Sequence, residues 1–269
     1  MLMHWLTIIV LGLVQGITEF IPVSSSGHLV IAQHLLGNSS SFELDVLLNF
    51  GTLAAVIIYY RKRLLSIATD IVKNRDLNLT LKLIVATLPA AIAGFLFQGF
   101  IENHLQGTLI VAIMLTLVGV LMILSVRWQP KASLAVNKDL HNVTYKNSFL
   151  IGLAQCVSLV SGTSRSGTTI LAALKLGYTK EKAAEWSFLM GIPIILGASL
   201  KVLLGHKGIT YVKTYPTEFL VANMLSFISG FIAIHYLMKI LQQRGLYWFG
   251  WYRIGLAVVL ILLLSVKIL

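Results

Sequence analysis

The stretch PVSSSGH, residues 22–28, places three hydroxyl groups and an imidazole directly after an apolar run that ends at Phe20 and Ile21. A second polar stretch, SGTSRSGT at residues 161–168, follows another apolar run. We call these stretches the first and the second elbow. Irregular polar backbone is tolerated at membrane depth only where protein or a wet cavity lines it. The two elbows therefore predict a membrane protein that folds around internal polar bends.

The composition supports a membrane protein. Of the 269 residues 57% are hydrophobic and 12% are charged, which is too little charge to cover a soluble domain. The apolar runs are long and continuous, so they predict helices rather than the alternating strands of a barrel. The net charge of +11 is expected in loops on one side of the membrane. No basic soluble face is visible, so membrane lipids are expected as partners and nucleic acid is not.

The chain contains an internal repeat with a spacing of 140 residues. Residues 12–37 align with 152–177 without a gap and are identical at nine of 26 positions, where about two are expected by chance. We predict one structural domain made of two copies, 1–128 and 147–269, joined by a cytoplasmic connector at 129–146. In each copy an apolar helix, an elbow and a short helix form a re-entrant hairpin, at about 5–36 and 147–176. Three spans are then expected in each copy, at about 45–60, 79–98 and 107–126, and at 183–205, 216–238 and 247–268.

Three spans per copy is an odd number, so the second copy is predicted to be inverted relative to the first. Basic residues agree with this count. If Arg61, Lys62 and Arg63 are cytoplasmic, most other lysines and arginines also fall in cytoplasmic loops, whereas the loop at 99–106 has none. The fold class is therefore an all-α polytopic membrane protein, with six transmembrane helices and two re-entrant helical hairpins in an inverted repeat. The hairpins are expected to enter from opposite sides, the first from outside, and to meet inside the membrane.

The two elbows differ where chemistry would require it. Glu19 precedes the first elbow, which contains Ser25 and His28, whereas the second elbow contains Arg165. A guanidinium matches phosphate oxygens, and a carboxylate can hold a hard cation such as Mg²⁺ against them. Ser25 and His28 are both candidate nucleophiles, and His28 is alternatively the base that activates Ser25. We thus predict a phosphate site with Ser25, His28, Glu19 and Arg165 as catalytic residues.

Other elbow residues are candidates for substrate binding, because exposed amides at helix N-termini bind anions. They are Ser24, Ser26, Gly27, Ser164, Ser166, Gly167 and Thr168, together with Gln15. Each also has a structural interpretation, since Ser and Gly are common helix caps. A carboxylate inside the membrane, such as Glu19, is functional by default because its burial is costly.

These motifs resemble those of the bacitracin-resistance family of undecaprenyl-diphosphate phosphatases, over essentially the whole chain. The family's E/Q-x-x-x-E motif appears as residues 15–19, its P-V-S-S-[ST]-G-H motif as 22–28, and its P-G-x-S-R-S-G motif as 161–167. Two positions depart from the usual pattern. Gln15 stands where Glu is usual, so its amide carries no charge, and Ser161 stands where Pro is usual.

The resemblance implies removal of one phosphate from undecaprenyl diphosphate, which recycles the lipid carrier of cell-wall precursors and confers bacitracin resistance. It further implies a multi-pass protein of the bacterial plasma membrane, with an active site that opens to the outer face. Glu19 and Gln15 would belong to a metal-assisted motif for Mg²⁺ or Ca²⁺, and Arg165 would bind the diphosphate. A homodimer is considered as the assembly. The alternative function is a transporter or flippase of a phosphorylated lipid or anion, because inverted repeats with broken helices also build transporters.

Overall fold

The computed structural model of the chain describes residues 2–37, 42–128, 140 and 143–266. Most of the predicted connector, 129–139 and 141–142, lies outside the described residues. The described part of the chain is helical and contains no strand.

The helices agree closely with the runs expected from the sequence. In chain order they are α1 (Leu2–Phe20), α2 (Ser25–Leu35), α3 (Phe42–Leu47), α4 (Asn49–Tyr59), α5 (Arg61–Thr69), a π-helical turn (Asp70–Asn74), α6 (Asn78–Leu96), α7 (Gln98–His104), α8 (Thr108–Leu124), a 3-10 turn (Ser125–Trp128), α9 (Tyr145–Val157), α10 (Arg165–Lys175), α11 (Lys180–Leu204), α12 (His206–Thr214), α13 (Pro216–Arg244) and α14 (Tyr247–Ser265). Helices α1–α2 and α9–α10 flank the first and second elbow, respectively.

Local sequence explains several helix ends. Pro216 opens α13, where its missing N–H is not needed. Gly37 and Gly177 follow the short helices α2 and α10 with φ of 64° and 84°. Glycine accepts this left-handed conformation without steric cost, which is why the same residue ends both helices.

Six helices are long and apolar enough to cross a membrane: α1 from Met3, α6, α8 with the 3-10 turn, α11, α13 and α14. By length alone α1 thus qualifies, although we predict it as half of a hairpin. The predicted span at 45–60 is instead divided between α3 and α4, and the chain bends by 69° where α5 follows. Leu48, the single residue between α3 and α4, keeps helical φ and ψ, and the segment Leu44–Tyr59 with Arg61–Asn74 counts as one bent span, which would make seven. The two re-entrant hairpins and the inverted topology stay predictions.

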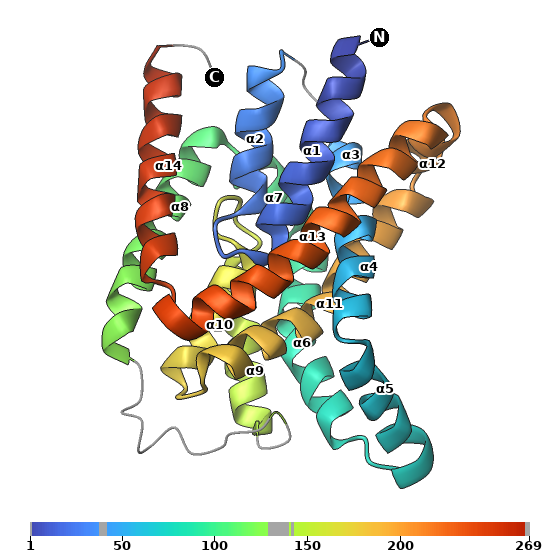
Figure 1. Cartoon of the computed structure of the whole chain (residues 1–269), viewed down its shortest axis with the longest axis vertical. Coiled ribbons are helices and arrows are strands. Elements are labelled where there is room, and N and C mark those ends of the chain that lie inside the picture. Colours follow the sequence, from blue (N-terminus) through green and yellow to red (C-terminus); the bar gives the residue numbers. More distant parts are fainter. Residues whose placement is uncertain (1, 38–41, 129–139, 141–142, 267–269) are drawn as a thin grey trace.

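The two hairpins lie in different halves of the molecule. Figure 1 shows α1 and α2 in the upper half and α9 in the lower half, with the elbows toward the middle. α1 packs against α13 of the other copy, and α9 packs against α6 of the other copy. A Cβ atom on Gly12 would lie 2.6 Å from Ala222 O, and one on Gly152 would lie 2.5 Å from Ala86 O. The repeated glycine therefore permits the same close helix contact in both copies.

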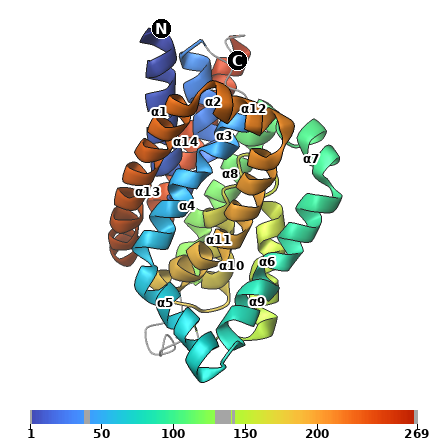
Figure 2. The same ribbon diagram turned by 90° about the vertical axis from the view of Figure 1, so that its right-hand side faces the viewer.

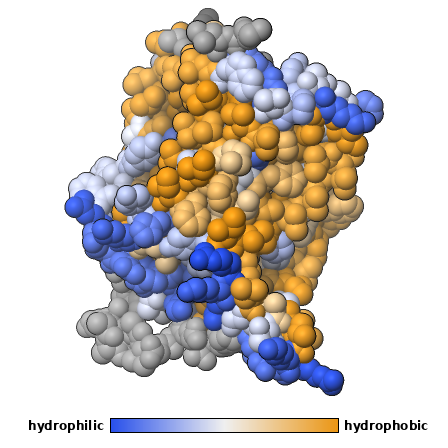
Figure 3. Space-filling view, turned by 45° about the vertical axis from the view of Figure 1, so that its right-hand side comes forward, coloured by the Kyte–Doolittle hydropathy of each residue, from blue (hydrophilic) through white to orange (hydrophobic). Residues whose placement is uncertain are grey.

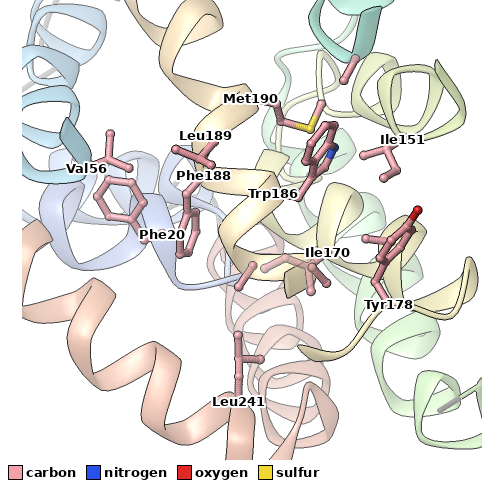
Figure 4. Packing of buried hydrophobic residues seen from close by; sticks show 14 of the residues in the cluster. Phe20, Val56, Ile151, Ile170, Tyr178, Trp186, Phe188, Leu189, Met190 and Leu241 are labelled. Carbon is pink, nitrogen blue, oxygen red and sulfur yellow. The ribbon is translucent and has the colours of Figure 1, made fainter. Parts of the chain in front are cut away.

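The main core surrounds the second elbow and its helices. The rings of Phe20 and Phe188 meet edge to face with centroids 5.3 Å apart, and Trp186 and Ile170 are also buried there (Figure 4). Phe20 ends α1 and Phe188 belongs to α11, so this contact anchors the first hairpin to the second copy. At membrane depth such contacts stabilise the fold through van der Waals packing, because lipid is as apolar as these side chains.

Much of the surface is apolar. Figure 3 shows hydrophobic side chains over the middle of one face, between hydrophilic patches near its two ends. Phe95 on α6 is 76% exposed, an arrangement that lipid favours and water does not. Figure 2 shows α7 and α12 near one end of the molecule and the basic helix α5 near the other. This separation agrees with the loop charges, which predict that α5 faces the cytoplasm.

Candidate active site

Both elbows hold a serine in an unusual backbone conformation. Ser24 has φ of 76° and Ser164 has φ of 72°, and the only other non-glycine residue with positive φ in the described chain is Arg75. The Ser24 and Ser164 hydroxyls accept hydrogen bonds from the amides of Gly27 and Gly167, at 3.3 and 3.2 Å. Such strain costs about 1–3 kcal/mol and is concentrated at functional sites. Its presence at equivalent positions in both copies makes the elbows a candidate site.

Each serine caps a short helix whose first amides face the elbow. α2 begins at Ser25 and α10 begins at Arg165, and each helix has 11 residues. The first amides of a helix have no acceptor within the helix, so they are suited to bind anions. The hydroxyls of Ser24 and Ser26 are 3.1 Å apart, and those of Ser164 and Ser166 are 3.2 Å apart. These contacts place the predicted binding serines at the two helix N-termini.

Glu19 lies at the centre of the polar contacts. Ser25 Oγ donates to Glu19 Oε2 at 3.0 Å, and Arg165 Nη2 donates to Glu19 Oε1 at 3.1 Å. Gln15 Nε2 donates to Glu19 Oε2 at 3.1 Å and to Asn49 Oδ1 at 2.7 Å. One carboxylate thus joins a hydroxyl of the first elbow to a guanidinium of the second.

The Arg165 side chain is fixed in this position. Its Nη1 donates to Ser187 O at 3.0 Å, and a Cβ atom on Gly191 would lie 2.1 Å from the same nitrogen. Glycine at position 191 therefore leaves room for the guanidinium. The Arg165 and Glu19 side chains are 10% and 11% exposed, so water screens their ion pair only weakly.

Further contacts join the elbows directly. Gly162 N of the second elbow donates to Ser26 Oγ of the first at 3.1 Å, and Ser166 Oγ donates to Glu19 O at 3.3 Å. The two elbows therefore meet, as predicted, and bring residues about 140 positions apart into contact; we call the region of these contacts the chamber.

His28 makes contacts that do not include Ser25. Its Nδ1 lies 2.7 Å from Ser24 O, and its Nε2 lies 2.7 Å from the hydroxyl of Tyr252. A carbonyl oxygen only accepts, so Nδ1 carries the hydrogen and the neutral ring accepts from Tyr252 at Nε2. Thr168 occupies the equivalent position in the second copy and likewise donates to Ser164 O, at 3.1 Å. The shared role of His28 and Thr168 is to bind the carbonyl of the capping serine.

The site contains residues that the motifs did not indicate. Asn49 contacts Gln15, and Tyr252 contacts His28, yet they come from α4 and α14. For Asn49 the one available signal in the sequence is its position, a side-chain amide within an apolar run. For Tyr252 the sequence offers none, because tyrosine is common at membrane interfaces.

The oxygen atoms around Glu19 suit a hard cation. Glu19 supplies a carboxylate, and Gln15 and Asn49 supply amide oxygens, which are the ligands that Mg²⁺ and Ca²⁺ prefer. The described residues contain no cluster of three or more His, Cys, Asp or Glu side chains that could hold a metal. The carboxylate and the two amide oxygens thus fit part of the ligand set of a hard cation.

The structure contains two crevices near the hairpins, and the larger reaches the first elbow at Val23 and His28. The larger, about 840 Å³, is lined by apolar residues with His28 and Tyr252 on one side and Lys239 and Arg244 on another. The smaller, about 430 Å³, lies between α6, α7 and α11. Its lining includes Ile194, one helical turn after Gly191, which contacts Arg165.

Comparison with known proteins gives consistent matches. The family model described as "Bacitracin resistance protein BacA" matches residues 8–259. An undecaprenyl-diphosphatase of Aliivibrio salmonicida is 40% identical over 91% of this chain and 92% of its own length. An undecaprenyl-diphosphatase 2 of Stutzerimonas stutzeri is 38% identical over 98% of this chain and 99% of its own length.

Proposed function

The chain belongs to the family of the bacitracin resistance protein BacA, and from this membership we infer that it is an undecaprenyl-diphosphatase. It hydrolyses undecaprenyl diphosphate to undecaprenyl phosphate and phosphate. The reaction recycles the lipid carrier for peptidoglycan synthesis, and bacitracin resistance follows from the family. The observation in the structure that best supports this function is the bridge that Glu19 forms between Ser25 and Arg165.

For the first half of the reaction we propose Ser25 as the nucleophile and Glu19 as its base. The Ser25 hydroxyl already donates to Glu19 Oε2, so the carboxylate can take this proton as Oγ attacks the terminal phosphorus. The bond from phosphorus to the bridging oxygen then breaks, and undecaprenyl phosphate leaves with the bonding electrons. His28 is less suited to this role because both of its ring nitrogens bind other groups.

Glu19 passes the proton from Ser25 to the departing undecaprenyl phosphate and becomes a carboxylate again. For the second half, a water molecule attacks the phosphoserine and Glu19 takes one of its protons. The serine oxygen leaves and recovers a proton, which restores Ser25 and releases orthophosphate. Arg165 stabilises the charge on the phosphate oxygens in both halves, together with the first amides of α2 and α10. Most of the rate enhancement would come from such positioning and charge stabilisation, as is general for phosphoryl transfer.

We further propose that Glu19, Gln15 and Asn49 hold a divalent cation, Mg²⁺ or Ca²⁺, together with the diphosphate. When bound, the cation would neutralise part of the phosphate charge. Gln15 presents its carbonyl oxygen while its amide nitrogen donates to Glu19 and Asn49. An uncharged amide at this position leaves Glu19 as the single carboxylate of the set, which is sufficient for Mg²⁺ when phosphates complete the ligands.

We propose the bacterial plasma membrane as the location, with the chamber open to the outer face. The loop charges and the position of α5 support this orientation. In this arrangement the prenyl chain lies in the crevice between α6 and α11, whose walls include Phe95, Leu159 and Ile194. Part of its wall is α11, the helix whose Ser187 O accepts a hydrogen bond from Arg165. The homodimer stays a prediction.

The proposed function is tested with purified protein in detergent. Phosphate release from undecaprenyl diphosphate is expected without any membrane gradient, which a transporter would not produce. Arg165→Ala is expected to abolish turnover and weaken substrate binding, whereas Arg127→Ala, a change at an exposed arginine, should have no effect. Absence of phosphate release by the unaltered protein would contradict the proposed function. Near-normal hydrolysis by Arg165→Ala would contradict the role of Arg165.

A further inference from the structure

Arg253 is a charged residue in the interior that the reaction as proposed does not use. It lies in α14 and is 0% exposed. Within the described chain it forms no ion pair, and its three nitrogens donate instead to five backbone carbonyls. Burial of a charge at membrane depth is costly and usually serves a function. All three nitrogens of the side chain thus bind backbone carbonyls, which indicates a role in holding the backbone.

The acceptors of Arg253 connect both elbows to one helix. Nη1 donates to Pro22 O of the first elbow at 3.3 Å. Nη2 donates to Gly162 O and Thr163 O of the second elbow at 2.8 and 3.0 Å. The remaining bonds reach carbonyls of α8, from Nη2 to Met114 O at 3.2 Å and from Nε to Leu115 O at 3.3 Å. One planar group thus holds the backbone that leads into both strained serines.

We propose that Arg253 is a positioning residue that clamps the two elbows together, so that Ser25 and Glu19 face Arg165. Only the expected effect of Arg253 on kcat rests on the proposed function. The clamp itself follows from the contacts, since Pro22 lies two residues before Ser24, and Gly162 and Thr163 directly precede Ser164. A shift of Arg253 would therefore move the N-termini of α2 and α10 relative to each other.

The geometry requires an arginine. Its rigid fork offers five N–H donors in one plane, whereas a lysine at this position offers three donors at a single point. Arg253→Lys keeps the charge but cannot reach carbonyls on three sides at once. The variant therefore separates the clamp from the positive charge. Arg127→Lys is the matched control because Arg127 is exposed in the 3-10 turn after α8 and lines neither crevice.

The first measurement is phosphate release by the full-length protein in detergent, below the melting midpoint of every variant. In Arg253→Lys we expect kcat to fall about 10²-fold, the effect of a misplacement near 1 Å, while KM changes little. If Arg253→Lys only destabilised the fold, a smaller fraction of the molecules would stay folded on heating, but each folded molecule would keep its kcat. A kcat close to that of the unaltered protein in folded Arg253→Lys would overturn the proposal.

The second measurement does not depend on hydrolysis. Ser25→Cys is introduced in a Cys156→Ser background, and the rate of its alkylation by a water-soluble maleimide is measured. Ser25 is only partly exposed, so loosening the elbows by Arg253→Lys should raise this rate at least about fivefold, as expected for loss of one or more hydrogen bonds. An unchanged alkylation rate would overturn the clamp, whether or not the unaltered protein releases phosphate. A raised alkylation rate in a protein that releases no phosphate would contradict only the proposed function.

A second variant keeps the test decisive if Arg253→Lys does not fold. Ser26→Ala removes one of the direct bonds between the elbows, the one that Gly162 N donates to Ser26 Oγ. Because Arg253 still holds both elbows, the alkylation rate should rise by less than about threefold. A larger rise would show that Ser26, rather than Arg253, is the clamp.

Discussion

The shared proton path of Ser25 and Glu19 predicts a specific result for a double variant. Ser25→Ala removes the nucleophile, and Glu19→Gln keeps the shape of the side chain but removes the base and the partner of Arg165. The third variant combines both changes. Because the Ser25 hydroxyl donates directly to Glu19, we expect the two residues to act as one unit.

The magnitude follows from this contact. A positioned general base contributes about 10²–10⁴-fold to the rate. If the two residues acted independently, the double variant would lose about 10⁴–10⁸-fold, the product of two such effects. Since neither residue can act without the other, we expect the double variant to be no slower than the slower single variant, as found for other catalytic units.

The assay is single-turnover phosphate release from undecaprenyl diphosphate in detergent, with Ser158→Ala as a serine control. Ser158 donates only to Gln155 O near the end of α9, so its removal should leave the rate unchanged. Loss of activity in Ser25→Ala but not in Glu19→Gln would exclude Glu19 as the base. A rate for the double variant near the product of the single losses would refute the shared proton path.

Three further predictions follow. A chelator should stop phosphate release. Gln15→Glu adds a second carboxylate beside Glu19, so it should lower the cation concentration that restores phosphate release after chelation. The same cation concentration for Gln15→Glu and the unaltered protein in a titration would speak against the proposed ligands. Gly197→Phe fills open space in the crevice between α6 and α11, so it should lower kcat/KM for the undecaprenyl substrate more than for a short prenyl diphosphate. The control Gly255→Phe, outside the crevice, should not lower kcat/KM for one substrate more than for the other. Equal losses for both substrates in Gly197→Phe would place the prenyl tail elsewhere. Gln155 has a buried side-chain amide without a hydrogen-bond partner among the described residues. Gln155→Met should therefore raise the free energy of unfolding by about 1–3 kcal/mol, measured by thermal unfolding in detergent. A lower melting midpoint for this variant would contradict the prediction.

Much of the architecture could be predicted from the sequence because it depends on local signals. The elbows are marked by Ser and Gly between apolar runs, and helices α2 and α10 begin after Ser24 and Ser164 as capping residues require. The repeat also predicted that the elbows meet, because hairpins of two inverted copies enter from opposite sides and come together inside the membrane.

Other features depend on contacts between distant segments and could not be predicted. Asn49 lies beside Gln15 only because α4 packs near α1, and Tyr252 reaches His28 from a helix 224 residues later. The engagement of His28 by Ser24 and Tyr252 is what separates it from Ser25, and no spacing in the sequence reveals it. Arg253 carries a signal that we did not use in the sequence analysis, since a lone arginine within an apolar run indicates function.

The two copies have the same backbone but different chemistry. The capping serine, its strained φ and its bond from the following glycine occur in both. The side chains that would perform catalysis occur once each: Ser25 is matched by Arg165 and Glu19 by Leu159, whereas Gln15 is matched by the unpartnered Gln155. A symmetric site would place two carboxylates or two guanidinium groups together, and like charges repel. Divergence of the copies therefore turns two anion-binding helix ends into one site with a base on one side and a cation on the other.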